Sequence, residues 1–221
     1  MILNSMIEDT VLHEKIKEIK KELRLAMNGI VSTHQRTQGL NYKINFGVEI
    51  PRLKAIAAKR TQEKDLALAL WQDNIRECKL LAIILLPPEN YSEVAEMWIA
   101  EAPFTEIADH LAKTILCAMP DAADSAVSNI CRSEGLYAYC GYMTLSHLFR
   151  TGKQLTAEQE DIYLKEVREI SSKGRGNTVV LAAYNSIAHY IESFPDVATK
   201  ARKVFATKEG MLEVLESIIE E

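Results

Sequence analysis

Apolar residues recur every three or four positions along most of the chain, whereas the alternation of a half-buried β-strand never persists. The first apolar stripe predicts a helix over 8–28, with Gly29 as its stop. The stripe consists of Leu12, Ile16, Ile19, Leu23 and Met27. An irregular loop is expected over 38–47, where Phe46 is expected to seal the end of the helical stack.

Prolines punctuate the rest of the pattern. Pro51 opens a helix at its first turn, where its missing N–H costs nothing, and the later prolines fall between periodic segments. Thr156 and Gln159 have the spacing of a capping box. The predicted helices are 51–60, 63–72, 75–86, 90–101, 104–117, 121–132, 136–150, 156–171, 177–192, 195–205 and 208–220. This pattern predicts an all-α chain with Trp71 and Trp98 in its core.

The helices also recur in pairs. Helices that begin at Ile75, Phe104, Tyr137 and Asn177 are each followed by a partner, at start-to-start distances of 29, 33 and 40 residues. A helical solenoid builds its core from such pairs, although a bundle of the same helices would give a similar sequence. The expected organisation is one domain over 1–221, made of an N-terminal capping helix and loop (1–50), helical repeats (51–205) and a C-terminal helix (206–221).

Composition restricts the class of protein. With 48% hydrophobic and 26% charged residues, the chain is neither disordered nor collagenous. The longest apolar run, Leu80 to Leu86, is far shorter than the roughly 20 residues that a bilayer crossing needs. The N-terminus has no basic region and turns acidic at once, which is not typical of a signal peptide. A cytoplasmic location is therefore expected.

The sequence contains no motif typical of redox cysteines, metal sites, nucleotide binding or serine hydrolases. The four cysteines, at 78, 117, 131 and 140, form no C-x-x-C pair and are expected to be reduced core residues. The five histidines have no metal-ligand spacing, and the glycine-rich phosphate loops and the G-x-S-x-G motif are absent. We expect neither a metal nor a cofactor.

Charge is distributed unevenly. Residues 1–60 carry eleven Lys or Arg against six Asp or Glu, whereas residues 61–150 carry six against thirteen. The basic first quarter suits phosphate contacts, while the acidic middle favours a protein-interaction scaffold.

Three stretches in this order resemble a known family. They are Asn45–Ile56, with the letters NFGVEIPRLKAI; Leu66–Trp71 (LALALW) followed by Ile75–Ala82 (IRECKLLA); and Phe104–Asp109 (FTEIAD). Together they are similar to the DNA alkylation repair family, the AlkD-like bacterial DNA glycosylases built of HEAT-like repeats. The likeness is clear over about residues 40–120 and continues more weakly to about residue 205.

The resemblance implies a right-handed α-solenoid of HEAT-like helix pairs whose concave, electropositive face holds duplex DNA. Active members of the family hydrolyse the N-glycosidic bond of N3- or N7-alkylated purines, and a carboxylate stabilises the positive charge that develops on the sugar. Asp109 falls on the position of that carboxylate in the family pattern W-D-x-x-D.

Other cleft positions depart from the family. Thr105 replaces the first aromatic residue, and Asn185, with Tyr184 beside it, replaces a second. The family's W-x-R-R segment aligns with Tyr137–Cys140, so that Tyr139 stands where an arginine is expected. The resemblance thus implies a cleft lined by Thr105, Tyr139, Tyr184 and Asn185.

Each of these residues also has a plainer interpretation. Asp109 and Lys113 have the spacing of a surface ion pair on a helix. The tyrosines at 137, 139 and 142 suit buried packing with each hydroxyl hydrogen-bonded. The candidate DNA-binding cations, which equally suit solvated faces, helix ends or a mobile glycine-rich loop, are Lys43, Arg52, Lys54, Lys113, Arg150, Lys153, Lys173 and Arg175.

The function expected from these residues is binding of duplex or structured DNA by backbone and shape, with Asp109 as the candidate for residual excision of alkylpurines. The alternative is a non-catalytic HEAT-repeat scaffold for a protein partner. We expect a monomer that does not bind membranes.

Overall fold

The computed structural model describes the backbone of residues 2–208 and 210–220, and the side chains of 10–208 and 210–219. These residues form α-helices and short 3-10 turns without a β-strand, so the all-α prediction is confirmed. No helix in this part of the chain has the length and hydropathy that a membrane crossing requires. The helices are α1 (Ile2–Leu25), α2 (Gly29–Thr37), α3 (Ile50–Ala57), α4 (Lys64–Trp71), α5 (Arg76–Leu85), α6 (Tyr91–Glu101), α7 (Thr105–Thr114), α8 (Ala122–Ile130), α9 (Tyr137–Arg150), α10 (Ala157–Glu169), α11 (Asn177–Ser193), α12 (Asp196–Phe205) and α13 (Met211–Glu220), with 3-10 turns η1 (Pro88–Asn90), η2 (Leu116–Ala118) and η3 (Ile170–Ser172).

Helix α2 was not predicted. The sequence pattern took Gly29 as the stop of the first helix, but α1 ends at Leu25 and Gly29 is the first residue of α2. Asn28 causes this break, because its side-chain oxygen accepts hydrogen bonds from the backbone N–H groups of Ile30 and Val31 and so caps α2. The predicted helices further along the chain are present, with ends that differ by a few residues.

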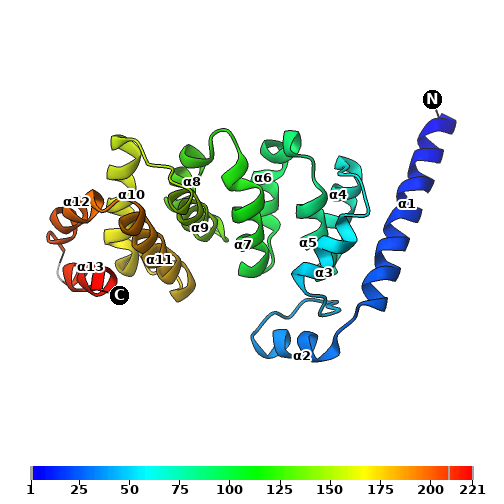
Figure 1. The fold of residues 1–221 in the computed structure, drawn as a ribbon, viewed down its shortest axis with the longest axis horizontal. Helices are drawn as coiled ribbons and strands as arrows, with labels where there is room; N and C mark the ends of the chain where they lie inside the picture. The colour runs from blue at the N-terminus through cyan, green and yellow to red at the C-terminus, as the bar shows by residue number, and fades with distance from the viewer. Residues whose placement is uncertain (1, 209, 221) are drawn as a thin grey trace. The chain divides into compact units, whose positions relative to one another are not determined.

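The chain divides into two compact units, Met1–Glu93 and Val94–Glu221. In the first unit α4 packs against α5 and α1, and α3 packs against α5 (Figure 1). Trp71 is fully buried there, as predicted, and Trp98 is fully buried in the second unit. The expectation of one continuous repeat domain over 1–221 stays a prediction.

The irregular loop of the first unit is fixed by a buried carboxylate. Glu77 is 0% exposed and accepts hydrogen bonds from the backbone N–H groups of Phe46 and Val48, at 3.1 and 3.2 Å. The Arg76 guanidinium donates both to Glu77 and to the Val48 carbonyl. Because every charge in this cluster is paired, it fixes the path of the loop and is unlike a site that waits for a ligand.

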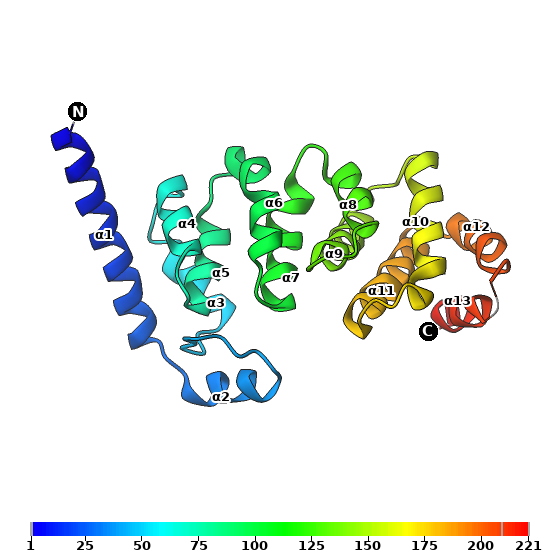
Figure 2. The same ribbon diagram turned by 180° about the vertical axis from the view of Figure 1, so that it is seen from behind.

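In the second unit α9 is the central helix. It packs against α7, α8 and α11, and Figures 1 and 2 both show α7, α9 and α11 as neighbours. Gly141 allows the approach to α8, because a Cβ at this position would lie 2.7 Å from the Ala126 carbonyl oxygen. The predicted capping box of Thr156 and Gln159 is present at the start of α10.

Two predictions about the core are partly wrong. Cys78 and Cys140 are buried, but Cys117 is half-buried and Cys131 is exposed because it follows the last turn of α8. All four cysteines are free.

The tyrosines of α9 are buried, as the plainer interpretation predicted. Tyr137 donates its hydroxyl hydrogen bond to Glu96 and Tyr139 donates to Asp109. The hydroxyl of Tyr142, however, is buried without a partner among the described residues. The expectation that all three hydroxyls are hydrogen-bonded is therefore wrong for Tyr142.

Candidate nucleic-acid interface

Asp109 lies on α7, outside the apolar face of that helix. The buried residues of α7 are Ile107, Ala108, Leu111 and Ala112. Tyr139 of α9 donates a hydrogen bond of 2.9 Å to Asp109 Oδ1, and Asp109 is half-buried. The predicted surface ion pair with Lys113 is absent, since Lys113 forms no ion pair with any residue described. The partner of Asp109 is thus a phenol and not a cation.

This environment favours the neutral form of the carboxyl group. Burial raises the pKa of Asp109 and the charge of Glu106 raises it further, whereas the hydrogen bond from Tyr139 lowers it. Burial and the charge of Asp109 also hold the pKa of Tyr139 well above its usual value, so the phenol stays a hydrogen-bond donor. The pair presents a partly desolvated carboxylate with one oxygen held in place, which is suited to interact with positive charge.

Among the described residues, the other predicted cleft residues form no side-chain hydrogen bond with Asp109. Thr105 is half-buried at the first position of α7, one helical turn before Asp109. On α11, the hydroxyl of Tyr184 lies 2.7 Å from the Ser171 hydroxyl, and Asn185 is exposed. The structure therefore brings Tyr139 to Asp109, while Tyr184 and Asn185 belong to a helix that packs against α9.

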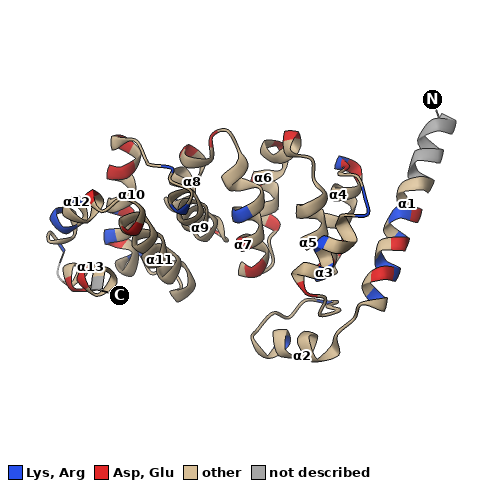
Figure 3. Cartoon of the chain, in the orientation of Figure 1, with Lys and Arg blue, Asp and Glu red and all other residues tan. Residues whose placement is uncertain are grey.

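A basic pocket lies at the C-terminal ends of α7 and α9. It has a volume of about 430 Å³ and is lined by Lys113, Cys117, His147, Leu148, Arg150 and Thr151. Lys113 and Arg150 are exposed and form no ion pair in the described part of the chain. Figure 3 shows basic residues on both helices.

His147 is the most enclosed of the three nitrogen-bearing side chains in this pocket. Burial lowers its pKa, and the positive charges of Lys113, Arg150 and His189 lower it further. His189 comes from α11, where its Nδ1 lies 2.5 Å from the Ser146 hydroxyl. Sequence reasoning missed both histidines because they have no ligand spacing. The spacing of His147 and Arg150 in the last turn of α9 was the available signal.

The predicted DNA-binding cations fall into two groups. Lys173 pairs with Glu166, while Arg175 lies 3.9 Å from Glu166 and donates to the carbonyl oxygen of Arg132. The loop that carries them is therefore bound to its own unit, which differs from the mobile loop that the sequence suggested. Of the eight predicted cations, the six that form no ion pair in the described chain are Lys43, Arg52, Lys54, Lys113, Arg150 and Lys153.

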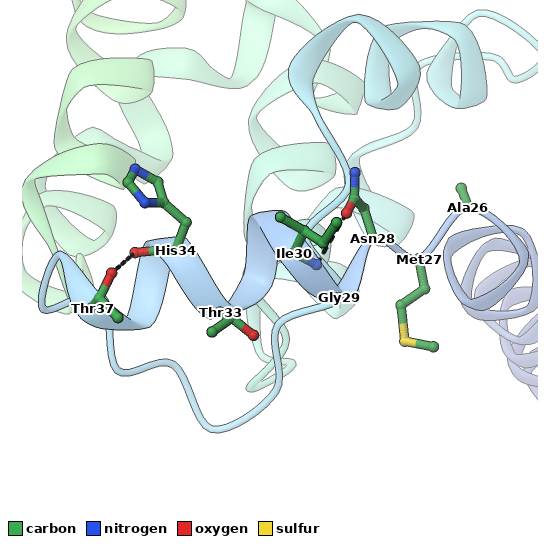
Figure 4. Close-up of a pocket in the computed structure, with 8 residues that line it drawn as sticks. All are labelled: Ala26, Met27, Asn28, Gly29, Ile30, Thr33, His34 and Thr37. Atoms are coloured by element: carbon green, nitrogen blue, oxygen red, sulfur yellow. Dashed lines mark hydrogen bonds between the residues drawn. The ribbon is translucent and has the colours of Figure 1, made fainter.

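A second hollow lies on the first unit, between the end of α1 and α2 (Figure 4). Its volume is about 1080 Å³, and no Lys, Arg, Asp or Glu lines it. Leu25, Met27 and Ile30 around this turn are 80%, 62% and 85% exposed. This patch is apolar and so differs in character from the basic pocket of α7 and α9.

These features define a helical protein with a basic surface site and a half-buried carboxylate. The family model described as DNA alkylation repair enzyme matches residues 19–138, which is more than half of the sequence. The chain belongs to the DNA alkylation repair family.

A solved structure supports the fold. It is a member of a new family of proteins related to the HEAT-like repeat DNA glycosylases with affinity for branched DNA structures. The match has a TM-score of 0.76 at 18% identity and covers 92% of this chain and 93% of that one. The predicted fold class, an α-solenoid of HEAT-like helix pairs, is thereby confirmed. No curated protein matches the chain.

Proposed function

We propose that this protein binds duplex or branched DNA through its phosphate backbone, using cations that its own carboxylates leave free. The observation that carries the proposal is the pocket in which two cationic side chains, Lys113 and Arg150, meet the imidazole of His147 and no carboxylate is among the lining residues. Lys43, Arg52, Lys54 and Lys153 add exposed cations without ion pairs. The branched-DNA affinity of the structural relative supports a branched substrate.

Cations that pair with carboxylates of the chain differ from the cations proposed to bind DNA. Lys173, Lys200 and Arg202, for example, are each held by a glutamate of the same unit. An exposed cation without a partner is available to replace the counterions around DNA, and the release of those counterions favours binding. Contacts of this kind position the protein on the backbone and carry no base-sequence information.

The test is the affinity for fluorescently labelled duplex and four-way-junction DNA, measured by anisotropy. The double variant Lys113→Ala/Arg150→Ala is expected to bind both about tenfold more weakly and to reduce the slope of log K against log salt by roughly 2. Lys165→Ala/Lys203→Ala is the matched control, because both residues are exposed, lie on α10 and α12, and form no ion pair in the described chain.

An equal loss in both double variants would contradict the assignment to α7 and α9. If the wild-type protein shows no salt-dependent affinity for either DNA, the DNA-binding proposal fails and the scaffold alternative takes its place.

A second candidate function, excision of alkylated purines, is favoured by the Asp109–Tyr139 pair. In this reaction the C1′–N bond breaks, its electron pair leaves with the cationic base, and water adds to the sugar carbon with loss of a proton. Asp109 would stabilise the positive charge that develops on the sugar, and Tyr139 would hold the carboxylate in position.

The test of excision is release of 7-methylguanine and 3-methyladenine from duplex DNA, quantified by mass spectrometry. Release above the spontaneous rate is expected for the wild type and for Asp121→Asn, an exposed control, and is expected to be lost in Asp109→Asn. Release that survives in Asp109→Asn would exclude this carboxylate, and no release by the folded wild type would exclude the activity on these lesions.

A further inference from the structure

The pocket at the ends of α7 and α9 offers donors and no carboxylate. Of its polar side chains, Thr151 donates its hydroxyl hydrogen to the Leu148 carbonyl, and the Cys117 thiol donates to the Lys113 carbonyl. The nitrogen-bearing groups of Lys113, His147 and Arg150 remain for a ligand. A pocket lined in this way is suited to an anion that accepts several hydrogen bonds.

The negative ends of the two helix dipoles neutralise only part of the positive charge in this pocket. The C-terminal ends of α7 and α9 each carry about half a negative charge, so together they offset roughly one of the positive charges. Lys113 and Arg150 supply two, and His147 supplies a third when it is protonated. The pocket therefore keeps a net positive charge that the chain itself does not neutralise.

The positive groups line a pocket of about 430 Å³ at the ends of two helices, and such a recess suits some phosphates better than others. A phosphodiester inside a strand has nucleotides on both sides and lies along an open surface, whereas a terminal phosphate has one side free to enter a recess. A phosphate monoester also carries about 1.5 to 2 negative charges at neutral pH. Arginine binds the oxygens of such a group with two parallel hydrogen bonds, and lysine adds a point charge.

We infer that this pocket is a binding site for a phosphate monoester, presented by the end of a DNA strand. The part of the inference that concerns DNA rests on the proposed function. The site would allow the protein to distinguish a strand end that carries a phosphate from one that carries a hydroxyl group.

Occupancy of the pocket is linked to the protonation of His147. The groups that face this imidazole are Lys113 from α7, the Cys117 thiol from η2, Arg150 from its own helix and His189 from α11. An anion in the pocket offsets the positive charges of Lys113 and Arg150, so the neutral imidazole gains affinity for a proton. Phosphate binding and proton uptake by His147 then favour each other.

The first experiment compares otherwise identical labelled duplexes that end in a 5′-hydroxyl, a 5′-phosphate or a 3′-phosphate. We expect one phosphorylated end to bind at least about fivefold more tightly than the hydroxyl end, a difference well outside the error of an affinity ratio. Lys113→Ala/Arg150→Ala is expected to remove this ratio, whereas Lys165→Ala/Lys203→Ala keeps it. Equal affinities of the wild type for all three ends would overturn the inference.

The second experiment does not need DNA binding. Inorganic phosphate is titrated into the wild-type protein while the ring protons of His147 are followed by NMR at several pH values. Saturable shifts and a rise in the pKa of His147 are expected, and the Lys113→Ala/Arg150→Ala variant should show neither. If the protein fails to bind DNA, the proposed function fails, but this titration still shows whether the pocket binds phosphate. The absence of any phosphate-dependent shift would overturn it.

Discussion

At the scale of single residues, the partial burial of the Asp109 carboxylate destabilises the folded protein. Its pKa is raised, which means that desolvation of the carboxylate outweighs the hydrogen bond from Tyr139. Among the described residues no cation pairs with Asp109 to offset this cost, although Lys113 is only four residues away on the same helix. A residue that opposes the stability of its own fold is typical of a functional position.

This cost predicts the effect of Asp109→Asn on stability. The amide keeps the shape and accepts the Tyr139 hydrogen bond without burying a charge, so we expect the variant to be more stable at pH 7, by no more than about 1 kcal/mol, or roughly 2–4 °C in Tm. A carboxyl group whose pKa is raised in the folded state lowers the free energy of unfolding at pH values where it is ionised. This destabilisation is lost as pH falls through the folded-state pKa.

The gain should therefore shrink as thermal unfolding is repeated at falling pH. Asp121→Asn, at an exposed position, should show neither the gain nor its pH dependence. A lower Tm for Asp109→Asn at pH 7 would contradict the argument.

The sequence predicted some of the site residues and missed others for identifiable reasons. Asp109 was found by its position in the family pattern, and Tyr139 by its place in the arginine segment. The contact between them joins residues thirty positions apart, which no local pattern reveals. Likewise, the partner that holds Lys173 and Arg175 is a glutamate of α10, and it became evident only when the helix was placed beside the loop.

At the scale of elements, helices with a clear apolar period were predictable, whereas α2 was not. It has nine residues, of which Ser32 alone is buried, so it has no apolar stripe. Its position is fixed by the loop that follows it. The Asn28 N–H donates to the Phe46 carbonyl, and the Ser32 hydroxyl donates to the Asn45 carbonyl. Tertiary contacts and one capping residue define this helix.

Gly47 lies where the loop passes close to the start of α2. Its φ of +70° is in the left-handed region, and a Cβ there would lie 2.2 Å from the Asn28 carbonyl oxygen and 2.6 Å from the Ser32 nitrogen. Both atoms are backbone and cannot move aside cheaply. We expect Gly47→Ala to lower the free energy of unfolding by more than about 2 kcal/mol, since it adds a steric clash to the cost of the conformation.

Gly39→Ala is the matched control for this prediction. Gly39 has a φ of +87° but open space around its Cβ position, so its substitution tests the conformational cost alone, about 1 kcal/mol. Denaturant unfolding followed by circular dichroism measures both variants. Equal losses would show that the contact with α2 contributes nothing.

At the scale of the whole molecule, net charge does not show which charges are already paired. The acidic excess over residues 61–150 favoured a protein scaffold in the sequence analysis, but many of its carboxylates are neutralised by cations of the same unit. Glu77 pairs with Arg76, Asp73 with Lys20 and Glu96 with Arg132. Lys113 and Arg150, in contrast, form no ion pair among the described residues, and a residue count does not reveal this difference.

The six predicted DNA-binding cations without an ion pair in the described chain also predict the salt dependence of DNA binding. Three of them lie in the first unit (Lys43, Arg52, Lys54) and three in the second (Lys113, Arg150, Lys153). If all six contact phosphates, the slope of log K against log salt reaches about −5, and removal of either triad by alanine substitution reduces its magnitude by nearly 3.

Anisotropy measured between about 50 and 200 mM salt gives these slopes. Lys173→Ala/Arg175→Ala, in which the lost charges are held by Glu166, should leave the slope unchanged. A reduction by one triad only would restrict the DNA interface to the unit that carries it.

The two sides of α7 have a consequence for how this protein can change. Ile107, Ala108, Leu111 and Ala112 are buried and hold the helix in place, whereas Thr105, Asp109 and Lys113 are not part of that buried set. The residues that hold α7 in place and the residues that carry its polar groups are therefore at different positions of the same helix. Substitutions at Thr105, Asp109 and Lys113 can therefore change the chemistry of this side of α7 while the four buried residues that hold the helix stay the same.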